Sequence, residues 1–267
     1  MTLWHILILA VVQGVAEFLP ISSSGHLVIL EDLLGAKGDL MEVNIALHAG
    51  TLLSILVFYW QRVWRLLSED RRVVLLLLVG SIPTGVVGLT VEATAKETLE
   101  CSLLAGCMLL VTGAVLLLTA WLTSSGRAAG RVSYQEMTYG KSFLIGLSQA
   151  VAVLPGVSRS GSTICAALSL GLSPQSAATF SFLLAIPAIA GATLLEIVRS
   201  IGPETSSTPL GYLLLGAAVS FGVGLMALRW LLRLLEKGSL RIFAWWCIPV
   251  GLSVIAWNAI TEGWLPL

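Results

Sequence analysis

Long apolar stretches alternate with short polar connections along the whole chain. Six of the stretches are long enough to cross the ~30 Å hydrocarbon core of a bilayer as helices. They run at about 44–60, 73–90, 101–122, 177–198, 210–232 and 242–260. Two further stretches are apolar but interrupted: one starts at Leu3, and the other runs from Ser142 to Gly171. The pattern predicts six membrane spans and two segments that enter the bilayer without crossing it.

The first interrupted stretch carries the polar run QGVAEFLPISSSGHL, from Gln13 to Leu27. Pro20 ends any helix that passes through it, and the serine run favours irregular backbone. Polar, irregular backbone at membrane depth is tolerated only where it is buried in protein or lines a wet cavity. We therefore expect a re-entrant segment that carries a functional site.

A second copy of this run lies 136 residues downstream, where QAVAVLPGVSRSG (149–161) aligns without a gap on residues 13–25. Six of the thirteen aligned positions are identical. The differences are chemical: Glu17 aligns with Val153, Ser23 with Arg159, and His26 with Ser162. One copy supplies an acid and an imidazole, and the other supplies a guanidinium. Two broken helices in matching places predict a repeat whose halves meet around one central site.

Composition narrows the class of protein. Hydrophobic residues make up 57% of the 267 residues and charged residues only 11%, which excludes an ordinary soluble domain. The net charge of zero argues against nucleic acid as a partner. The four cysteines form no CxxC pair and predict no disulfide framework. The stretch 3–12 lacks a basic flank and a cleavage site, so we expect it to be part of the mature protein.

The positions of lysine and arginine predict the orientation. Three connections hold eleven of the fifteen basic residues and are expected on the cytoplasmic side: Arg62, Arg65, Arg71, Arg72; Arg127, Arg131, Lys141; Arg229, Arg233, Lys237 and Arg241. The connections 31–42, 92–100 and 199–208 are poor in basic residues and should face out. The first re-entrant segment then enters from outside and the second from inside.

These observations together predict the fold class and its division. The chain should be an all-α polytopic membrane protein with an inverted-topology repeat, six transmembrane helices and two re-entrant broken-helix segments. The first repeat is expected at residues 1–122 and the second at 142–267, joined by a solvated cytoplasmic linker at 123–141.

Small residues at Gly80, Gly85, Gly88, Gly216, Gly222 and Gly224 are expected to mark close helix crossings. Trp245 and Trp246 are expected in an interfacial belt.

Arg159 stands at the centre of the second motif, PGVSRSG. A permanent charge at membrane depth must be matched by anionic oxygens, and phosphate fits the guanidinium fork well. The start of the following half-helix adds hydroxyl and backbone donors that can cradle an anion, at Ser158, Ser160, Gly161, Ser162 and Thr163. The alternative is that Arg159 only pairs with Glu17 and holds the two halves together.

The first motif places hydroxyls beside an imidazole. Ser22, Ser23 and Ser24 offer a nucleophile, and His26 lies close enough in sequence to act as its base. Glu17 could orient the imidazole, hold a divalent cation or act as a base for water. The alternative is that the serines cap the helix that follows and that His26 packs against them.

The motifs EFLPISSSGH, PGVSRSG and FSFLLAIPA (180–188) together resemble the bacitracin-resistance family of undecaprenyl-diphosphate phosphatases, over essentially the whole chain. The resemblance implies hydrolysis of undecaprenyl diphosphate to undecaprenyl phosphate and inorganic phosphate, which recycles the lipid carrier of peptidoglycan synthesis. It also implies Ser23 as nucleophile with His26 as its base or as an alternative nucleophile, a catalytic Glu17, and a phosphate clamp at Ser158 and Arg159.

The family signature (E/Q)xxxE falls on Gln13 and Glu17, and members are similar in depending on a divalent cation such as Mg²⁺ or Ca²⁺. Gln13 stands where other members carry a second glutamate, so Glu17 is the carboxylate expected to bind the metal, helped by substrate oxygens. Substrate contacts are expected from Gln13 and from the serines, glycine and threonine of the two motifs: Ser22, Ser24, Ser158, Ser160, Gly161, Ser162 and Thr163.

The resemblance further implies a bacterial cytoplasmic (inner) membrane protein whose active site opens to the periplasmic side. The expected partners are undecaprenyl diphosphate and membrane lipids, with bacitracin acting indirectly by competing for the substrate, and a homodimer is compatible with this reading. Two other functions fit parts of the pattern. A polyprenyl-phosphate flippase or small-anion transporter would share the inverted repeat and the buried arginine. An intramembrane serine hydrolase is disfavoured because residues 156–161 read GVSRSG and lack a GxSxG arrangement.

Overall fold

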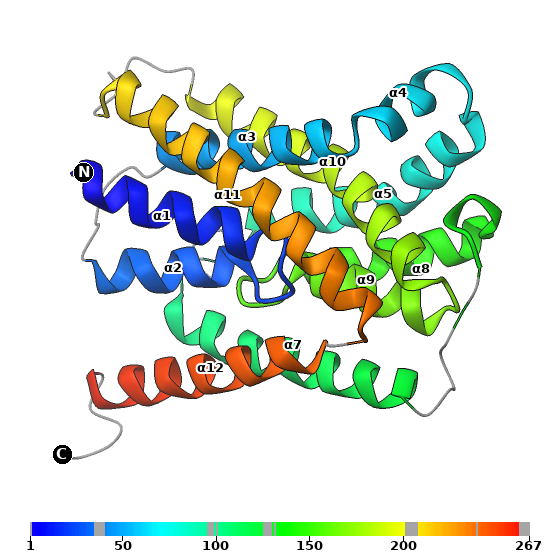
Figure 1. The fold of residues 1–267 in the computed structure, drawn as a ribbon. Helices are drawn as coiled ribbons and strands as arrows, with labels where there is room; N and C mark the ends of the chain where they lie inside the picture. Colours follow the sequence, from blue (N-terminus) through cyan, green and yellow to red (C-terminus); the bar gives the residue numbers. More distant parts are fainter. Residues whose placement is uncertain are drawn as a thin grey trace.

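The computed structural model describes residues 2–34, 41–94, 99, 101–124, 130, 132–200, 208–238 and 240–261. Over these ranges the chain is almost entirely helical (Figure 1). Six helices are long and apolar enough to cross a membrane, which confirms the predicted spans: α3 (Met41–Phe58), α5 (Arg71–Thr94), α7 (Ser102–Ser124), α10 (Pro174–Ser200), α11 (Leu210–Glu236) and α12 (Arg241–Thr261). The predicted outward connections 31–42, 92–100 and 199–208 lie partly outside the described residues.

Two helical hairpins confirm the two interrupted segments. The first pairs α1 (Leu3–Ala16) with α2 (Ser23–Leu33), and the second pairs α8 (Tyr139–Val151) with α9 (Arg159–Ser169). Each helix is too short to cross a bilayer. In Figure 1 the first hairpin comes from the left and the second from the right, and their tips approach in the middle of the bundle. The chain therefore reaches the same central region twice, from opposite ends.

Matching helix caps support both hairpins. Thr2 and Thr138 are 136 positions apart, and each side chain accepts a hydrogen bond from the backbone N–H three residues later. The donors are His5, at 3.4 Å, and Lys141, at 3.3 Å. Ser22 does the same for α2, and Ser158 does so for α9. A hydroxyl at the cap satisfies a backbone N–H that has no partner inside the helix. The repeat seen in sequence thus sets where all four short helices begin.

Each hairpin packs on a span of the opposite half. Helix α1 lies along α11, and α8 lies along α5, while α7 and α12 pair with each other. A β-carbon on Gly216 would lie 2.9 Å from the Ile6 side chain, and one on Gly80 would lie 3.0 Å from Ser142. These two contacts are again related by a shift of 136 residues, so Gly80 and Gly216 mark close crossings as predicted.

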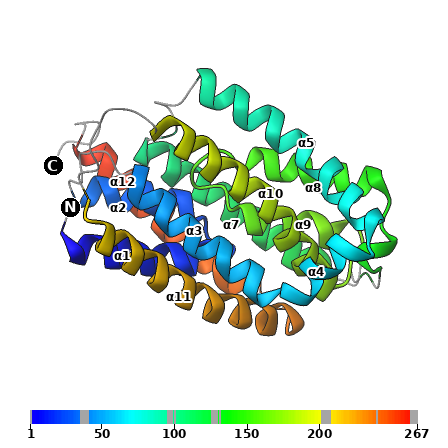
Figure 2. The ribbon, with the colours of Figure 1, turned by 90° about the horizontal axis from the view of Figure 1, so that it is seen from above.

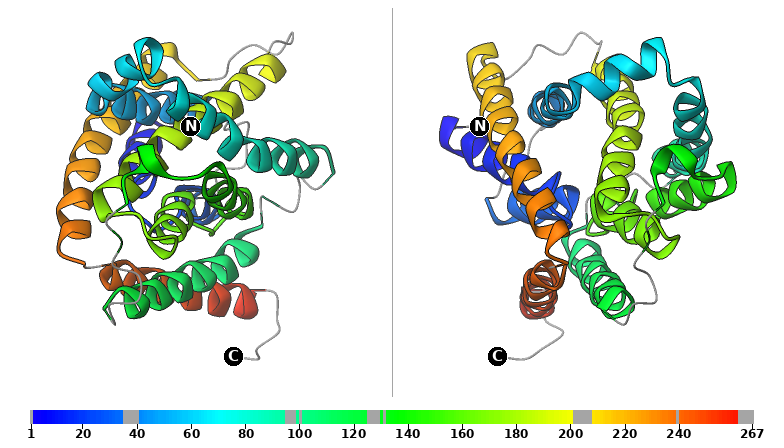
Figure 3. Two further views of the ribbon diagram at one scale, coloured as in Figure 1. Left: turned by 90° about the vertical axis from the view of Figure 1, so that its right-hand side faces the viewer. Right: turned by 45° about the vertical axis from the view of Figure 1, so that its right-hand side comes forward.

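The halves differ in how two other helices meet. Helix α3 packs closely on α11, where Gly50 lies against Ala217 and a β-carbon on Gly224 would lie 2.7 Å from the Ser54 hydroxyl. The equivalent pair, α10 and α5, makes much less contact, and one end of α5 extends away from α10 in Figures 2 and 3. A β-carbon on Gly85, Gly88 or Gly222 would meet nothing within 4 Å. The prediction that these three glycines mark close crossings is therefore wrong.

The segment between the halves is more ordered than expected. Residues 125–129 and 131 of the predicted linker lie outside the described residues. Beyond them, the short helix η1 (Tyr134–Glu136) packs onto the bundle, with Tyr134 and Met137 buried. Arg72 donates a hydrogen bond of 3.0 Å to the Met137 carbonyl. The prediction of a solvated connection is wrong for this part, because apolar side chains and an arginine tie it to α5 and α10.

Candidate active site

The two hairpin tips are joined by hydrogen bonds at membrane depth. The Gly156 N–H donates to the Ser22 hydroxyl over 3.1 Å, and the Ser160 hydroxyl donates to the Leu19 carbonyl over 3.1 Å. Backbone also meets backbone, since a β-carbon on Gly25 would lie 2.7 Å from Gly156 Cα. Gly156 has a φ of 92°, which favours glycine. The two broken segments therefore meet at their tips, as the repeat predicts.

Glu17 is the centre of this contact. One carboxylate oxygen accepts a hydrogen bond of 2.6 Å from Arg159 Nη2, across the boundary between the halves. The other accepts 2.5 Å from the Ser23 hydroxyl and 3.2 Å from the Gln13 amide nitrogen. Glu17 is only 7% exposed. A single buried carboxylate thus links the guanidinium of one repeat to the serine of the other.

Two polar atoms beside Glu17 have no partner in the part of the chain described. They are Arg159 Nη1 and Gln13 Oε1, both buried. A buried donor without an acceptor costs about 1–3 kcal/mol, and more when it is charged. The ion pair between Arg159 and Glu17, which the alternative from the sequence predicts, is formed. It uses Nη2 of the guanidinium and leaves Nη1 without a partner. An anionic ligand at this position would satisfy that donor.

The serines of both motifs act as helix caps. Ser22 Oγ accepts 3.2 Å from the Gly25 N–H, and Ser158 Oγ accepts 3.0 Å from the Gly161 N–H. Ser22 adopts a φ of 71°, which is unusual for a residue with a side chain. The capping role considered from the sequence for the first motif is therefore confirmed for Ser22, and Ser158 has the same role in the second motif. It leaves Ser23, one residue further, free to turn toward Glu17.

His26 is placed differently from the expectation. Its Nδ1 lies 2.7 Å from the Ser22 carbonyl, and its Nε2 lies 2.9 Å from the indole nitrogen of Trp246 on α12. The carbonyl is an acceptor and the indole N–H is a donor, so these partners define the tautomer with the proton on Nδ1. Both ring nitrogens are thus engaged elsewhere, and Ser23 bonds to Glu17. In this geometry the Ser23 hydroxyl faces Glu17 and not His26, and the role of His26 as the base for Ser23 stays a prediction.

Trp246 is the residue that sequence reasoning missed. Its ring stacks on His26 with centroids 6.2 Å apart and planes inclined by 13°. From the sequence it was assigned to an interfacial belt, and half of it is indeed exposed. The two residues are 220 positions apart, so only the fold brings them together. No pattern in the sequence marks this pair.

A small pocket of about 30 Å³ opens between the tips, enough for one or two water molecules. Its walls come from both hairpins: Ala16, Glu17, Ser22, Ser23, Ser24, Ala152, Val157, Ser158 and Arg159. Other expected substrate contacts lie outside this lining. Thr163 donates to the Arg159 carbonyl and lies 2.5 Å from the Ser181 hydroxyl of α10, and Ser160 bonds to Leu19. Gly161 packs against Pro20, and its N–H donates to the capping Ser158 hydroxyl of α9, while the Ser148 hydroxyl donates to the Ser162 carbonyl over 3.4 Å.

The donor set around Glu17 fits a divalent cation only together with a ligand's oxygens. Among the described residues, no group of three His, Cys, Asp or Glu side chains is close enough to hold a metal ion. Glu17 is the carboxylate of the site, and Gln13, whose amide nitrogen donates to Glu17, has an unpartnered amide oxygen. Mg²⁺ accepts one or two carboxylates plus phosphate oxygens and water. The site therefore supplies the protein part of such a set.

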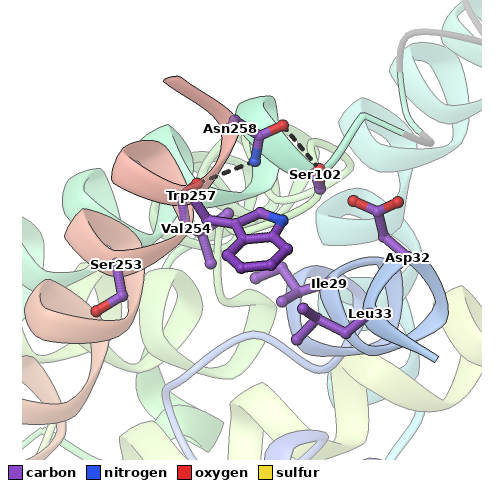
Figure 4. Close-up of a pocket in the computed structure, with 8 residues that line it drawn as sticks. All are labelled: Ile29, Asp32, Leu33, Ser102, Ser253, Val254, Trp257 and Asn258. Carbon is purple, nitrogen blue, oxygen red and sulfur yellow. Dashed lines mark hydrogen bonds between the residues drawn. The ribbon is translucent and has the colours of Figure 1, made fainter. Parts of the chain in front are cut away.

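A separate cavity of about 210 Å³ lies between α2, α7 and α12. Figure 4 shows the Trp257 ring above Ile29 and Leu33, and the Ser102 hydroxyl bonded to Asn258 over 3.2 Å. Asp32 is the charged residue of its lining. None of its lining residues belongs to the pocket between the tips, so it is not part of the candidate active site.

Comparison with known proteins identifies the family. The family model described as bacitracin resistance protein BacA matches residues 6–253. A protein of Rhodopirellula baltica named undecaprenyl-diphosphatase is 51% identical over 95% of this chain and 97% of its own length. Proteins of the same name from Desulfatibacillum aliphaticivorans and Halothermothrix orenii are 40% and 36% identical over 96% of this chain, and the matches cover 99% and 98% of their lengths. The six spans, the paired hairpins and this near-complete match place the chain in the bacitracin resistance protein BacA family.

Proposed function

We propose that this protein hydrolyses undecaprenyl diphosphate to undecaprenyl phosphate and inorganic phosphate. In the cell this reaction would recycle the lipid carrier of peptidoglycan synthesis and confer resistance to bacitracin, which competes for the same lipid. The observation that carries the proposal is the sharing of buried Glu17 between Ser23 and Arg159. A hydroxyl nucleophile, a carboxylate base and a phosphate-binding guanidinium meet at one point inside a membrane protein. This combination fits hydrolysis of a lipid diphosphate better than it fits a packing role alone. The names of the relatives support the same substrate.

Substrate binding would begin at Arg159. Its Nη1 is buried without a partner in the described structure, while Nη2 is held by Glu17. Phosphate oxygens can take both nitrogens of the fork at once, and a doubly charged phosphate competes well with one carboxylate. When the guanidinium turns to the phosphate, Glu17 loses its counter-ion and accepts a proton more readily. Binding would thereby activate the base only when substrate is present.

The chemical step would then use the Ser23–Glu17 hydrogen bond. The Ser23 hydroxyl gives its proton to Glu17 Oε2, and its oxygen attacks the terminal phosphorus in line with the leaving group. The new bond joins Ser23 Oγ to phosphorus, and the bond to the bridging oxygen breaks. Undecaprenyl phosphate leaves, and its departing oxygen is stabilised by Arg159. Glu17 passes the serine proton to the departing phosphate and is again a base. Water then attacks the phosphoserine and gives a proton to Glu17, which returns it to Ser23 Oγ as the bond between Ser23 Oγ and phosphorus breaks and inorganic phosphate leaves.

A divalent cation is part of the proposal. Glu17 would be its protein ligand, and the Gln13 amide oxygen could join it once substrate oxygens complete the set. When bound, the cation neutralises charge on the diphosphate. Residues of this chain perform the other tasks: Arg159 binds phosphate, Ser23 attacks, and Glu17 carries the proton.

His26 would be a positioning residue in this scheme. Its ring bonds to the Ser22 carbonyl, which is the backbone group that directly precedes Ser23. The contact with Trp246 fixes the ring from the other side. His26 would therefore hold the backbone of the tip so that the Ser23 hydroxyl meets Glu17.

The proposed location is the cytoplasmic membrane, with the site open to the periplasmic side, as the distribution of basic residues suggests.

The test is phosphate release by purified protein in detergent. Wild-type protein supplied with undecaprenyl diphosphate and Mg²⁺ or Ca²⁺ should release one phosphate per lipid, and Ser23→Ala and Arg159→Ala should not. Phospholipid and soluble phosphate esters serve as substrate controls. Lack of release by a folded wild-type protein would overturn the proposal, and movement of intact lipid in the same preparation would favour a carrier.

A further inference from the structure

Beyond the tip of the second hairpin, a groove of about 660 Å³ separates α5 from α10. This volume is within the range of roughly 300–1,000 Å³ that small-molecule sites occupy. Its walls are mainly apolar and small, with Gly85 and Gly88 on α5 and Pro187 and Gly191 on α10. Val153, at the hairpin tip, also lines the groove.

The groove has a structural origin in the unequal packing of the halves. Helix α8 fills the space beside α5 only as far as Val151, so the second half of α5 has no short helix next to it. The equivalent space in the other half lies between α11 and α3, and it is closed because Gly50 and Gly224 let these helices touch. Figure 3 shows α5 standing away from α10. Only one of the two symmetry-related spaces is therefore open.

The groove and the pocket between the tips are lined by neighbouring residues of the second hairpin. Ala152 lines that pocket, and Val153, the next residue, lines the groove. Val153 is also the position that aligns with Glu17 in the repeat. The first copy therefore has a carboxylate at the pocket between the tips. The second copy has an apolar side chain at the matching position, beside the groove.

The groove also has the right surface for a hydrocarbon. Its hydroxyls are used within the protein: Ser81 donates 2.7 Å to the Leu77 carbonyl, and Thr84 accepts 3.0 Å from Gln149. Glu196 is the charged residue of the lining and lies on the second half of α10. A chain without hydrogen-bonding groups could contact these walls by van der Waals packing, which is what drives association between apolar surfaces within lipid.

We propose that the α5–α10 groove binds the prenyl chain of the lipid substrate and is the lateral path by which the diphosphate reaches the pocket between the tips. This inference rests on the proposed function for the identity of the lipid. The groove lies in the second halves of α5 and α10, which the basic-residue pattern assigns to the extracytoplasmic half of the membrane. Substrate therefore enters from that leaflet, with its chain in the groove and its diphosphate at Arg159.

Groove-filling variants test the proposal by kinetics. In Gly88→Leu the new side chain occupies the groove without meeting other atoms at its β-carbon. KM for undecaprenyl diphosphate should rise by about tenfold or more, which corresponds to about 1.4 kcal/mol of lost binding. KM for a soluble short-chain alkyl diphosphate, and kcat for both substrates, should be unchanged. The matched control is Gly222→Leu, because Gly222 is equally open but lies on α11 outside the groove.

Equal effects on the long and the short substrate would overturn the proposal, as would no effect on either. A second measurement does not need turnover. Gly88→Cys in phospholipid nanodiscs should be labelled by an apolar maleimide, as read by peptide mass spectrometry. A long-chain polyprenyl phosphate should protect the cysteine, and inorganic diphosphate should not. If the polyprenyl phosphate does not reduce labelling of the cysteine, the groove assignment is wrong. This conclusion holds even if wild-type protein proves to have no phosphatase activity.

Discussion

Ser23 donates a 2.5 Å hydrogen bond to Glu17, six residues earlier on the other arm of the same hairpin. The bond exists because the chain turns at residues 17–22 and because Ser22, as the helix cap, exposes the next hydroxyl toward the preceding helix. Glu17 in turn receives Arg159 from the other repeat. The Ser23 hydroxyl and the Arg159 guanidinium are therefore linked through one carboxylate.

The first prediction concerns this bond. Glu17→Gln keeps the shape of the side chain but cannot accept the Ser23 proton, so turnover should fall by about 100-fold or more. Ser23→Ala should abolish hydrolysis. The measurement is phosphate release from undecaprenyl diphosphate by purified variants, with folding checked by circular dichroism. Substantial activity in Ser23→Ala would show that another group attacks phosphorus.

The second prediction identifies the covalent intermediate. Rapid-quench labelling with substrate labelled in its terminal phosphate should trap a phosphoserine, stable in mild acid and labile in strong base. His26→Ala should still form this adduct, because both ring nitrogens of His26 already bond to Ser22 and Trp246. An acid-labile adduct that persists in Ser23→Ala and disappears in His26→Ala would instead assign the nucleophile to His26.

The third prediction concerns the guanidinium fork. Arg159→Lys keeps the charge but loses the bidentate geometry and the second donor that Nη1 provides. We expect kcat/KM to fall by about 100-fold or more, which is about 2.7 kcal/mol of transition-state stabilisation. Steady-state kinetics on the variant measure it. Near-normal kcat/KM would remove Arg159 as the phosphate clamp and leave it as a link between the halves.

The fourth prediction concerns Trp246. Trp246→Phe keeps the ring that stacks on His26 but loses the N–H donor, so kcat should fall by no more than roughly tenfold, the effect of one hydrogen bond. The matched control is Trp245→Phe, since Trp245 is its neighbour in sequence and is 72% exposed. Identical kinetics in both variants would mean that the indole N–H has no part in positioning His26.

The fifth prediction tests the contact between the tips. A methyl group at Gly25 would lie 2.7 Å from the Gly156 backbone, so Gly25→Ala should force the tips apart. Overpacking of this kind costs about 1–3 kcal/mol, and we expect a lower melting temperature together with loss of activity. Gly222→Ala, where the added methyl group meets nothing within 4 Å, should leave both unchanged. Full stability of Gly25→Ala would contradict the close approach of the two backbones.

The sequence by itself determined the architecture. Apolar length predicts the six spans, because only a helix of that length satisfies its backbone across hydrocarbon. The shift of 136 residues between the motifs predicts two matching broken segments, and the helix caps at Thr2 and Thr138 are related by the same shift. The residues Glu17, Ser23 and Arg159 also stand out, since polar groups in such a chain need a reason to be there.

Tertiary structure alone decided which of these groups touch. Ser23 is three residues from His26 and six from Glu17, so proximity along the chain favours the imidazole. The fold reverses this choice, because the His26 ring turns back to the Ser22 carbonyl and is held there by Trp246, 220 residues away. Likewise, Gly85, Gly88 and Gly224 look alike in sequence, yet only Gly224 lies in a helix crossing. Side-chain direction and the separation of α5 from α10 depend on packing between distant segments, which a local pattern does not encode.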